Sequence, residues 1–354
     1  MASFEEALVF IGTVLVGFFL ARAVGLIAHL RRRAMIPRRC RVYKSHHFDS
    51  TIWDDFKVRD GDIIIATAYK SGTTWMQQIV SELLFKEGEG PNVAECSPWL
   101  DFGGMPREET LAMLDAQTHR RFIKTHLPAT AMPYYPQAKY IYVGRDGRDA
   151  FMSLYNHYAT GNDDWYKTLN DRPGRVGPPL PRFDPQTTPA QLFDRWLGEG
   201  WEAHPWESDG WPWWSLLYNF ASWWEFRHLD NILFVHFANL KADLPGEMAR
   251  IAAFLGVPVE QLDKADFDER VRHCTFEYMR AHGEKVAPAG GALWKAPDGA
   301  STGAAAFFHR GTNGRWKEAL TPEQVRRYEE TVRDKLTPEG AHWLATGEAP
   351  PPGK

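Results

Sequence analysis

Residues 67–75 combine a lysine, a glycine and several hydroxyl side chains in the arrangement of a phosphate-binding loop. The segment reads TAYKSGTTW and stands between an apolar run, 62–66, and a stretch with helical periodicity, 74–85. Backbone N–H groups in such a turn converge on an anion, and the helix N-terminus adds partial positive charge. Lys70 precedes Gly72, whereas an ATP-type P-loop has its lysine directly after the glycine. The spacing predicts a phosphate ligand other than ATP, or else an ordinary Ser/Thr-capped helix.

A second pair of polar residues follows the apolar run 139–143. Arg145 ends that predicted strand and Ser153 stands about two turns into the next predicted helix, so both can face one point above the sheet. Arginine binds phosphate through two parallel N–H bonds, and a serine hydroxyl adds a directed bond. The pair predicts a second phosphate site, although an arginine at a strand end is as often part of a structural ion pair.

Two further segments carry residues suited to anion binding or proton transfer. Residues 308–317, FHRGTNGRWK, set two glycines beside basic side chains, which suits a loop around a phosphate but also a plain surface turn. His126, in KTHLP after the apolar run 121–125, is the candidate general base, because histidine titrates near neutral pH. A lone histidine is more often an ordinary core or surface residue, so this assignment depends on the other motifs.

These segments resemble those of the cytosolic-type sulfotransferases and occur in the family's order along the chain. The loop at 67–75 resembles the family's TYPKSGTTW, with Ala68 and Tyr69 in place of Tyr-Pro, and KTHLP at 124–128 matches the catalytic-histidine segment residue for residue. The resemblance spans residues 67–317. It implies a transferase whose donor is 3'-phosphoadenosine 5'-phosphosulfate (PAPS) and whose product is 3'-phosphoadenosine 5'-phosphate (PAP).

The remaining family segments match with substitutions. The 3'-phosphate segment RxxxDxxxSxYxH corresponds to residues 145–157, and RKGxxGxWK corresponds to 309–317, with His309 where the family usually has arginine. HCTFEYM at 273–279 resembles the adenine-side TSF segment, and Phe237 replaces a tyrosine that the family uses near the adenine. The family's C-terminal dimer motif is only partly present, which leaves homodimerisation open.

Carried over residue by residue, the resemblance implies three catalytic residues. Lys70 would contact the bridging oxygen of the donor, His126 would take the acceptor proton, and Lys124 would stabilise charge on the transferring sulfonate. No metal is expected, because PAPS is already activated and the histidines show no HExxH or HxxxH pair. The residues expected to contact the donor are Lys70, Ser71, Gly72, Thr73, Thr74, Trp75, Arg145, Ser153, Phe237, Thr275, Phe276, His309, Arg310 and Gly311.

These motifs need a sheet whose strands end at one edge. Four short apolar runs predict buried strands, at 62–66, 121–125, 139–143 and 231–237. Five periodic stretches predict helices, at 74–85, 147–158, 221–227, 246–255 and 322–335. The alternation predicts an α/β, P-loop-like fold with a central parallel sheet flanked by helices and ligands at the carboxyl ends of the strands. Two stretches rich in small and polar residues, 161–190 and 283–306, are expected to be long surface loops.

Aromatic residues gather in one part of the chain. Eight of the 15 tryptophans fall between Trp196 and Trp224. They are expected either to pack helices or to wall an acceptor pocket for a phenol, sterol or lipid alcohol. The adjacent His46 and His47 are expected in a solvated turn.

The N-terminus departs from the composition of the rest. Residues 7–30 form an apolar run about long enough to cross a bilayer, and the arginines at 31–33 follow it, so the catalytic body would stay cytoplasmic. An interfacial helix, or a true start at Met35, would also account for the run. We therefore expect an anchor and basic linker at 1–45, a sulfotransferase domain at 46–345 and a disordered tail at 346–354.

Composition sets the remaining limits. The formal net charge is -4, so no overall field attracts nucleic acid, and three scattered cysteines indicate a reducing compartment. We predict transfer of a sulfuryl group from PAPS to a hydroxyl or amine of a small, apolar, aromatic or lipid-like acceptor, by in-line displacement. Two alternatives remain. A P-loop kinase or NTPase would need the other glycine-lysine order, and a non-catalytic, membrane-tethered nucleotide-binding module would leave KTHLP unexplained.

Overall fold

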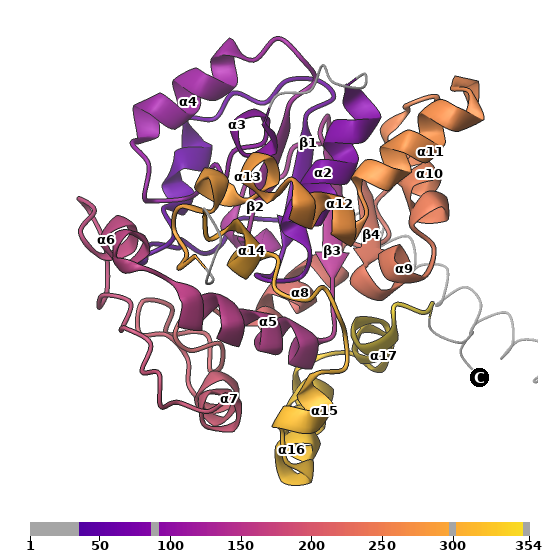
Figure 1. The fold of residues 1–354 in the computed structure, drawn as a ribbon. Helices are drawn as coiled ribbons and strands as arrows, with labels where there is room; N and C mark the ends of the chain where they lie inside the picture. Colours follow the sequence, from indigo (N-terminus) through magenta and orange to yellow (C-terminus); the bar gives the residue numbers. More distant parts are fainter. Residues whose placement is uncertain (1–34, 86–91, 297–301, 350–354) are drawn as a thin grey trace, which may run out of the picture. The chain divides into compact units, whose positions relative to one another are not determined.

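A parallel β-sheet forms the centre of the computed structural model, which describes residues 35–85, 92–296 and 302–349 (Figure 1). Four strands lie in the order β2–β1–β3–β4, and every neighbouring pair is parallel. Their bounds are Ile63–Thr67 for β1, Phe122–Thr125 for β2, Lys139–Gly144 for β3 and Ile232–His236 for β4. The four predicted strands are confirmed, each within one residue of its expected bounds.

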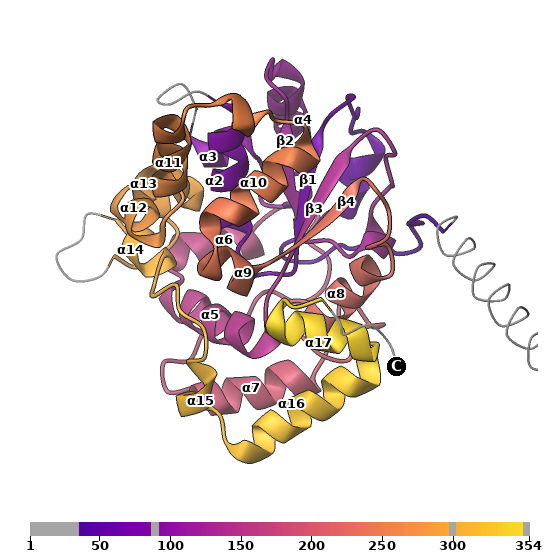
Figure 2. The same ribbon diagram turned by 90° about the vertical axis from the view of Figure 1, so that its right-hand side faces the viewer.

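Helices cover both faces of the sheet. On one face, α2 (Thr73–Leu84) and α10 (Leu244–Leu255) pack apolar side chains against alternate residues of the strands, such as Ile63 and Ile65 (Figure 2). On the other face, α5 (Gly147–Thr160) and α8 (Leu216–Trp224) contribute to the larger core, which contains Ile64. Burial on both faces explains why the strands read as continuous apolar runs.

The remaining helices surround these layers. They are η1 (Ser50–Asp54), α3 (Val93–Cys96), α4 (Arg107–Ala116), η2 (Ala129–Ala131), α6 (Asp163–Asn170), α7 (Pro189–Gly198), α9 (Phe237–Ala242), η3 (Val259–Gln261), α11 (Lys264–His273), α12 (Phe276–Ala281), α13 (Gly283–Val286), η4 (Pro288–Gly291), α14 (Ala304–Phe307), α15 (Trp316–Ala319), α16 (Pro322–Lys335) and α17 (Pro338–Thr346). The predicted helix at 322–335 coincides with α16, whereas the predicted helix at 221–227 overlaps only the second half of the observed helix α8. Its counterpart α8 begins at Leu216, because the Ser215 side chain caps it.

The connections place a crevice between β1 and β3. The helix after β1, α2, packs on one face of the sheet, and the helix after β3, α5, packs on the other. Neighbouring strands whose helices leave in opposite directions open a crevice at their carboxyl ends, where ligands of such sheets bind. The turn from β1 into α2 and the turn from β3 into α5 therefore meet at this point.

The expectation of two long surface loops is wrong in part. The stretch 161–190 contains α6, and Trp165, Leu169 and Leu180 are buried within it. The stretch 283–306 contains α13 and η4, and its Trp294 is buried as well. Large apolar side chains anchor both stretches, so their Gly and Pro content did not leave them at the surface.

The N-terminal prediction concerns residues that the structure does not describe. The apolar run at 7–30 lies outside the described residues, as does most of the expected tail from 350 onward. Within the described ranges, no helix is both long and apolar enough to span a lipid bilayer.

Candidate active site

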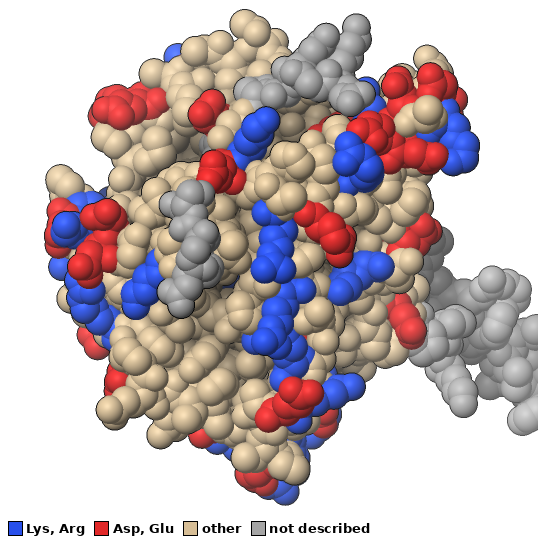
Figure 3. Space-filling view, in the orientation of Figure 1, with Lys and Arg blue, Asp and Glu red and all other residues tan. Residues whose placement is uncertain are grey.

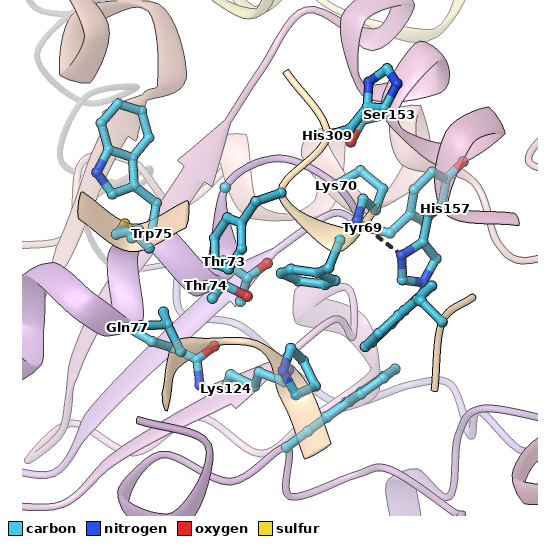
Figure 4. A pocket seen from close by; sticks show the side chains of 18 of the residues that line it. Tyr69, Lys70, Thr73, Thr74, Trp75, Gln77, Lys124, Ser153, His157 and His309 are labelled. Carbon is cyan, nitrogen blue, oxygen red and sulfur yellow. Dashed lines mark hydrogen bonds between the residues drawn. The ribbon is translucent and has the colours of Figure 1, made fainter. Parts of the chain in front are cut away.

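A cavity of about 1060 Å³ lies where the four strands end, and residues that follow each strand line it (Figure 4). Fifteen of the sixteen predicted site residues line this one cavity. They are Lys70, Gly72, Thr73, Thr74, Trp75, Lys124, His126, Arg145, Ser153, Phe237, Thr275, Phe276, His309, Arg310 and Gly311. The exception is Ser71, which is buried behind the wall with its hydroxyl 3.4 Å from the Tyr69 carbonyl oxygen.

The loop after β1 has the backbone of an anion cradle. Lys70 and Gly72 have positive φ angles, 57° and 109°, which turn the chain sharply before α2. No side chain caps the N-terminus of α2, and its first turn holds no acidic residue. The free N–H groups and the helix dipole can therefore serve an anion. A Cβ atom at position 72 would lie only 3.0 Å from the Phe237 ring, so the loop also needs glycine for space.

Arg145 joins three segments at the crevice. Its guanidinium donates to the backbone oxygen of Lys70 at 3.1 Å and to Asn313 Oδ1 at 3.0 Å, and it lies 4.0 Å from the centre of the Phe237 ring. Burial lowers the pKa of Arg145 to about 10, so it stays charged at neutral pH. Arg145 is thus held between the first loop and the loop at 309–315, where it could bind a second phosphate.

Aromatic residues stand beside these two cationic loops. The indole N–H of Trp75 donates to the Cys274 carbonyl at 2.7 Å, and the Trp75 and Phe237 rings lie 5.2 Å apart at 72°. The Phe276 ring packs so closely on Gly311 that a Cβ there would lie 2.5 Å from it. These rings present apolar surface beside the two cationic loops, on which a purine base can pack.

His126 is held in one tautomer by the backbone. Its Nδ1 lies 3.0 Å from the Thr67 carbonyl oxygen and 3.0 Å from the Thr67 hydroxyl oxygen. The carbonyl can only accept, so the bond to it requires the proton on Nδ1 and leaves the lone pair on Nε2. Asn219 fixes the histidine's own carbonyl at 2.8 Å. Burial, together with the charges of Lys124 and Lys70, lowers the pKa of His126 to about 3, so the ring is neutral and its lone pair is free.

Lys124 shares an aromatic wall with His126. The Trp99 ring lies edge-on to His126, with centroids 4.7 Å apart, and 5.3 Å from the Lys124 ammonium. The buried Asp101 accepts hydrogen bonds from the indole of Trp99 and from the Thr125 hydroxyl, which fixes this wall. Burial lowers the pKa of Lys124 to about 8, against the opposing effect of Asp101.

Lys70 points into the middle of the cavity. Its Nζ lies 3.2 Å from Nδ1 of His157 on α5 and 4.7 Å from the centre of the Phe307 ring (Figure 4). Burial, with the charges of Arg145 and Lys124, lowers the pKa of Lys70 to about 7. An anion bound beside it would restore the charged form.

The other half of the cavity is aromatic. Its large apolar lining residues include Trp99, Phe102, Met105, Trp165, Leu169, Trp213, Trp214, Trp294 and Phe307. Of the eight clustered tryptophans, only Trp213 and Trp214 belong to this lining, and they share the buried core with Trp196 and Trp223. The packing interpretation is confirmed for these four tryptophans, and the acceptor pocket stays a prediction. Sequence reasoning missed the tryptophans at 99, 165 and 294, which come from loops and a short helix remote from any motif.

The expectation of a solvated turn at His46 and His47 is wrong. Both imidazoles are buried, their Nδ1 atoms lie 2.5 Å apart, and the His47 ring lies 5.0 Å from that of Trp213. His47 lines the cavity. Packing by the aromatic residues of distant segments outweighs the local polarity of the HH pair.

The surface charge is uneven. A band of lysine and arginine side chains crosses the face of the molecule over α12 and α5 (Figure 3). The chain as a whole carries a formal charge of -4, so this attraction for anions is local. Among residues 35–85, 92–296 and 302–349, no group of three or more metal-binding side chains occurs.

Comparison with known proteins yields one family. Residues 60–340 match the model of the sulfotransferase domain. A glycolipid sulfotransferase of Mycobacterium tuberculosis is 34% identical over 318 residues, which cover 86% of this chain and 94% of that protein. Human sulfotransferase 2B1 is 30% identical over 292 residues, 79% of this chain and 67% of that protein.

Solved structures share the fold. A mouse sulfotransferase, SULT7A1, complexed with PAP has a TM-score of 0.59 at 21% identity and covers 83% of this chain and 92% of its own. Retinol dehydratase in complex with androsterone and inactive PAP has a TM-score of 0.58 at 21% identity and covers 81% of this chain and 84% of its own. At this identity the likeness establishes the P-loop-like fold expected from the sequence.

Proposed function

Since the chain belongs to the sulfotransferase family, we propose that it moves a sulfuryl group from PAPS to a hydroxyl or amine of an apolar, aromatic or lipid-like acceptor. The observation that carries this proposal is the division of the cavity. One half offers two cationic phosphate sites and a purine slot, the other is walled by indole rings, and Lys70, Lys124 and His126 line the same space.

The described residues fit PAPS as donor. The uncapped N-terminus of α2 and Lys70 suit the 5'-phosphosulfate, Arg145 and Ser153 suit the 3'-phosphate, and Trp75 suits the adenine. Two proteins with this fold carry PAP in their structures, which supports the same choice here. The Lys-before-Gly order and the side chains that suit a 3'-phosphate disfavour a kinase.

We propose that His126 acts as the general base. The acceptor hydroxyl gives its proton to Nε2 as its oxygen forms a bond to sulfur, and the bond from sulfur to the phosphate oxygen breaks on the opposite side. Lys70 stabilises the negative charge left on that phosphate oxygen, and Lys124 the charge on the sulfonate in flight. PAPS supplies an already activated sulfuryl group, so the protein's part is to orient, desolvate and deprotonate.

The acceptor half favours a lipid-like molecule. Its tryptophans bury large apolar area while Met105, which is 45% exposed, extends the lining toward solvent. A cavity of about 1060 Å³ exceeds what a nucleotide alone needs. The 34% identical relative named for glycolipids agrees with a large amphiphilic acceptor.

Two measurements test this function. Calorimetry with PAP, ATP and AMP should give the tightest binding for PAP, because only PAP engages both phosphate sites. Incubation with PAPS and a panel of phenols, sterols and glycolipids should then yield a product heavier by one sulfo group. Preferential binding of ATP would favour the kinase, and PAP binding without transfer to any acceptor would favour a non-catalytic module.

A further inference from the structure

His157 stands at the boundary between the two halves of the cavity. Its imidazole lies on α5, with Nδ1 3.2 Å from the Lys70 ammonium (Figure 4). The rest of the ring is enclosed by aromatic residues of the acceptor half, with centroids 5.6 Å from Trp165, 5.6 Å from Trp213 and 5.0 Å from Trp294. One nitrogen thus faces the donor side.

The contact with Lys70 determines where the imidazole proton lies. An ammonium group only donates, so Nδ1 must accept and the single ring proton belongs to Nε2. Burial and the charges of Lys70 and Lys124 lower the pKa of His157 well below its ordinary value, so the ring is neutral. His126 has the opposite tautomer, because its Nδ1 donates to a carbonyl.

The two histidines therefore present complementary atoms. His126 offers a lone pair on Nε2, and His157 offers an N–H on Nε2; within the described chain neither atom has a hydrogen-bond partner. Both residues line the same cavity, and His126 lies close enough to lower the pKa of His157. Besides these two, the titratable groups that act on this space are Lys70, Lys124 and His47.

We propose that His157 selects hydroxyl acceptors over amines: while Lys70 is an ammonium, Nε2–H of His157 donates to the acceptor oxygen whose proton His126 takes. This inference rests on the proposed function. A hydroxyl oxygen has two lone pairs, so one can accept from His157 while the other forms the bond to sulfur. A neutral amine has one lone pair and cannot do both. The proton leaves to His126 and the sulfur–phosphate bond breaks, as above.

The same contact links donor binding to acceptor selection. Because the pKa of Lys70 is lowered to about 7, the free protein holds both ammonium and amine at neutral pH, and the amine can accept from a protonated Nδ1. A bound phosphosulfate holds Lys70 in the ammonium form. His157 then keeps its proton on Nε2 throughout when the donor site is filled, and only in the ammonium fraction of molecules when the site is empty.

Two substitutions separate the two nitrogens of His157. An asparagine carbonyl can replace Nδ1 as the partner of Lys70, and a glutamine amide can replace the Nε2–H. In transfer assays with naphthol and naphthylamine, and with an acceptor from the panel and its amine analogue, we expect His157→Gln to keep the preference for alcohol. His157→Asn and His157→Phe should lower the preference about tenfold, as the loss of one good hydrogen bond implies. His342→Asn, outside the cavity lining, is the control.

Histidine ¹⁵N spectra test the tautomer without turnover. With PAP bound, His157 should carry its proton on Nε2, and Lys70→Met should abolish that preference. A proton on Nδ1 in the PAP complex, or an unchanged alcohol preference in His157→Phe, would overturn the selection role while leaving sulfuryl transfer intact. Absence of transfer in the wild type would instead overturn the proposed function.

Discussion

At the residue scale, rings and carbonyl oxygens hold the three cations of the cavity. Lys70 lies against Phe307, Lys124 against Trp99 and Arg145 against Phe237, at 4.7, 5.3 and 4.0 Å from the ring centres. Such contacts orient a cation but leave its charge in place, whereas a carboxylate would neutralise that charge. The charges are therefore preorganised for an anionic ligand, at the cost of lowered pKa values for both lysines.

Proton uptake follows from Lys70. Its pKa rises from about 7 when phosphates bind beside it, so at about pH 8 the amine gains a proton, and Lys124, with a pKa of about 8, adds a fraction. Ligand phosphates are already ionised there, with pKa values near about 6. Calorimetry of PAP binding in two buffers of different ionisation enthalpy should show net uptake of protons, and Lys70→Arg should reduce this proton uptake. Equal uptake in that variant would contradict the assignment.

Arg145 should distinguish ligands by their 3'-phosphate. We expect Arg145→Gln to weaken PAP binding by roughly 10- to 100-fold, the worth of a charge-assisted contact, and to change AMP binding much less. Titration calorimetry with both nucleotides measures this. Arg182→Gln, at an exposed ion pair with Asp163, is the matched control. An equal loss for both nucleotides would show that the arginine acts on loop structure alone.

At the element scale, the turn from β1 into α2 is the most constrained part of the site. Gly72 combines a φ of 109° with a Cβ position 3.0 Å from Phe237, whereas Gly174 has a φ of 72° and open space. Gly72→Ala should therefore weaken PAP binding well beyond its effect on stability. Gly174→Ala carries the backbone strain alone, about 1 kcal/mol, and should bind normally. Affinity and thermal unfolding of both variants give the comparison, and normal binding by Gly72→Ala would refute it.

Local sequence predicted the strands well and the connections poorly. Burial on both faces makes each strand a continuous apolar run, which is visible without tertiary information. The predicted helix at 221–227 missed the start of α8, because the Ser215 cap and the apolar first turn of α8 precede the periodic stretch. The sequence predicts loops around Trp165 and Trp294, because a single buried aromatic residue among polar ones gives no hydrophobic periodicity.

At the scale of the whole molecule, buried neutral groups set the dependence of stability on pH. The pKa values of His46, His126 and His204 are lowered by burial to about 3, so the unfolded chain binds protons that the folded chain excludes. This stability is complete above about pH 6.5 and is lost as pH falls toward about 3. Burial raises the pKa of Glu207 to about 8, so its contribution is complete below about 4.5 and is lost as pH rises through about 8.

Stability should therefore be greatest near neutral pH. Urea unfolding at about pH 5.5, 7 and 8.5 should show a loss on the acid side of about 1.4 kcal/mol per pH unit for each proton taken up, with more than one proton involved. Glu207→Gln should remove the loss of stability as pH rises through about 8, and it should steepen the loss on the acid side because the Glu207 contribution begins to fall at about pH 4.5. A free energy of unfolding independent of pH between about 5.5 and 7 would contradict the burial of neutral histidines.

Most of the donor side could be predicted from the sequence, and most of the acceptor side could not. The residues proposed to contact phosphate come from short contiguous loops such as 67–75, where spacing carries the chemistry. The proposed acceptor wall is assembled through tertiary packing from Trp99, Trp165 and Trp294, which are more than a hundred residues apart at the extremes. The burial of His47 and the tautomer of His157 depend on neighbours from distant segments, which no local sequence pattern identifies.

The most direct test is a single turnover in which enzyme preloaded with PAPS is mixed with an acceptor found in the panel. If His126 takes the acceptor proton, His126→Ala should bind PAP within about twofold of wild type and transfer roughly 10²- to 10⁴-fold more slowly, as loss of a general base implies. His342→Ala should match wild type. Transfer by His126→Ala at the wild-type rate would contradict the account.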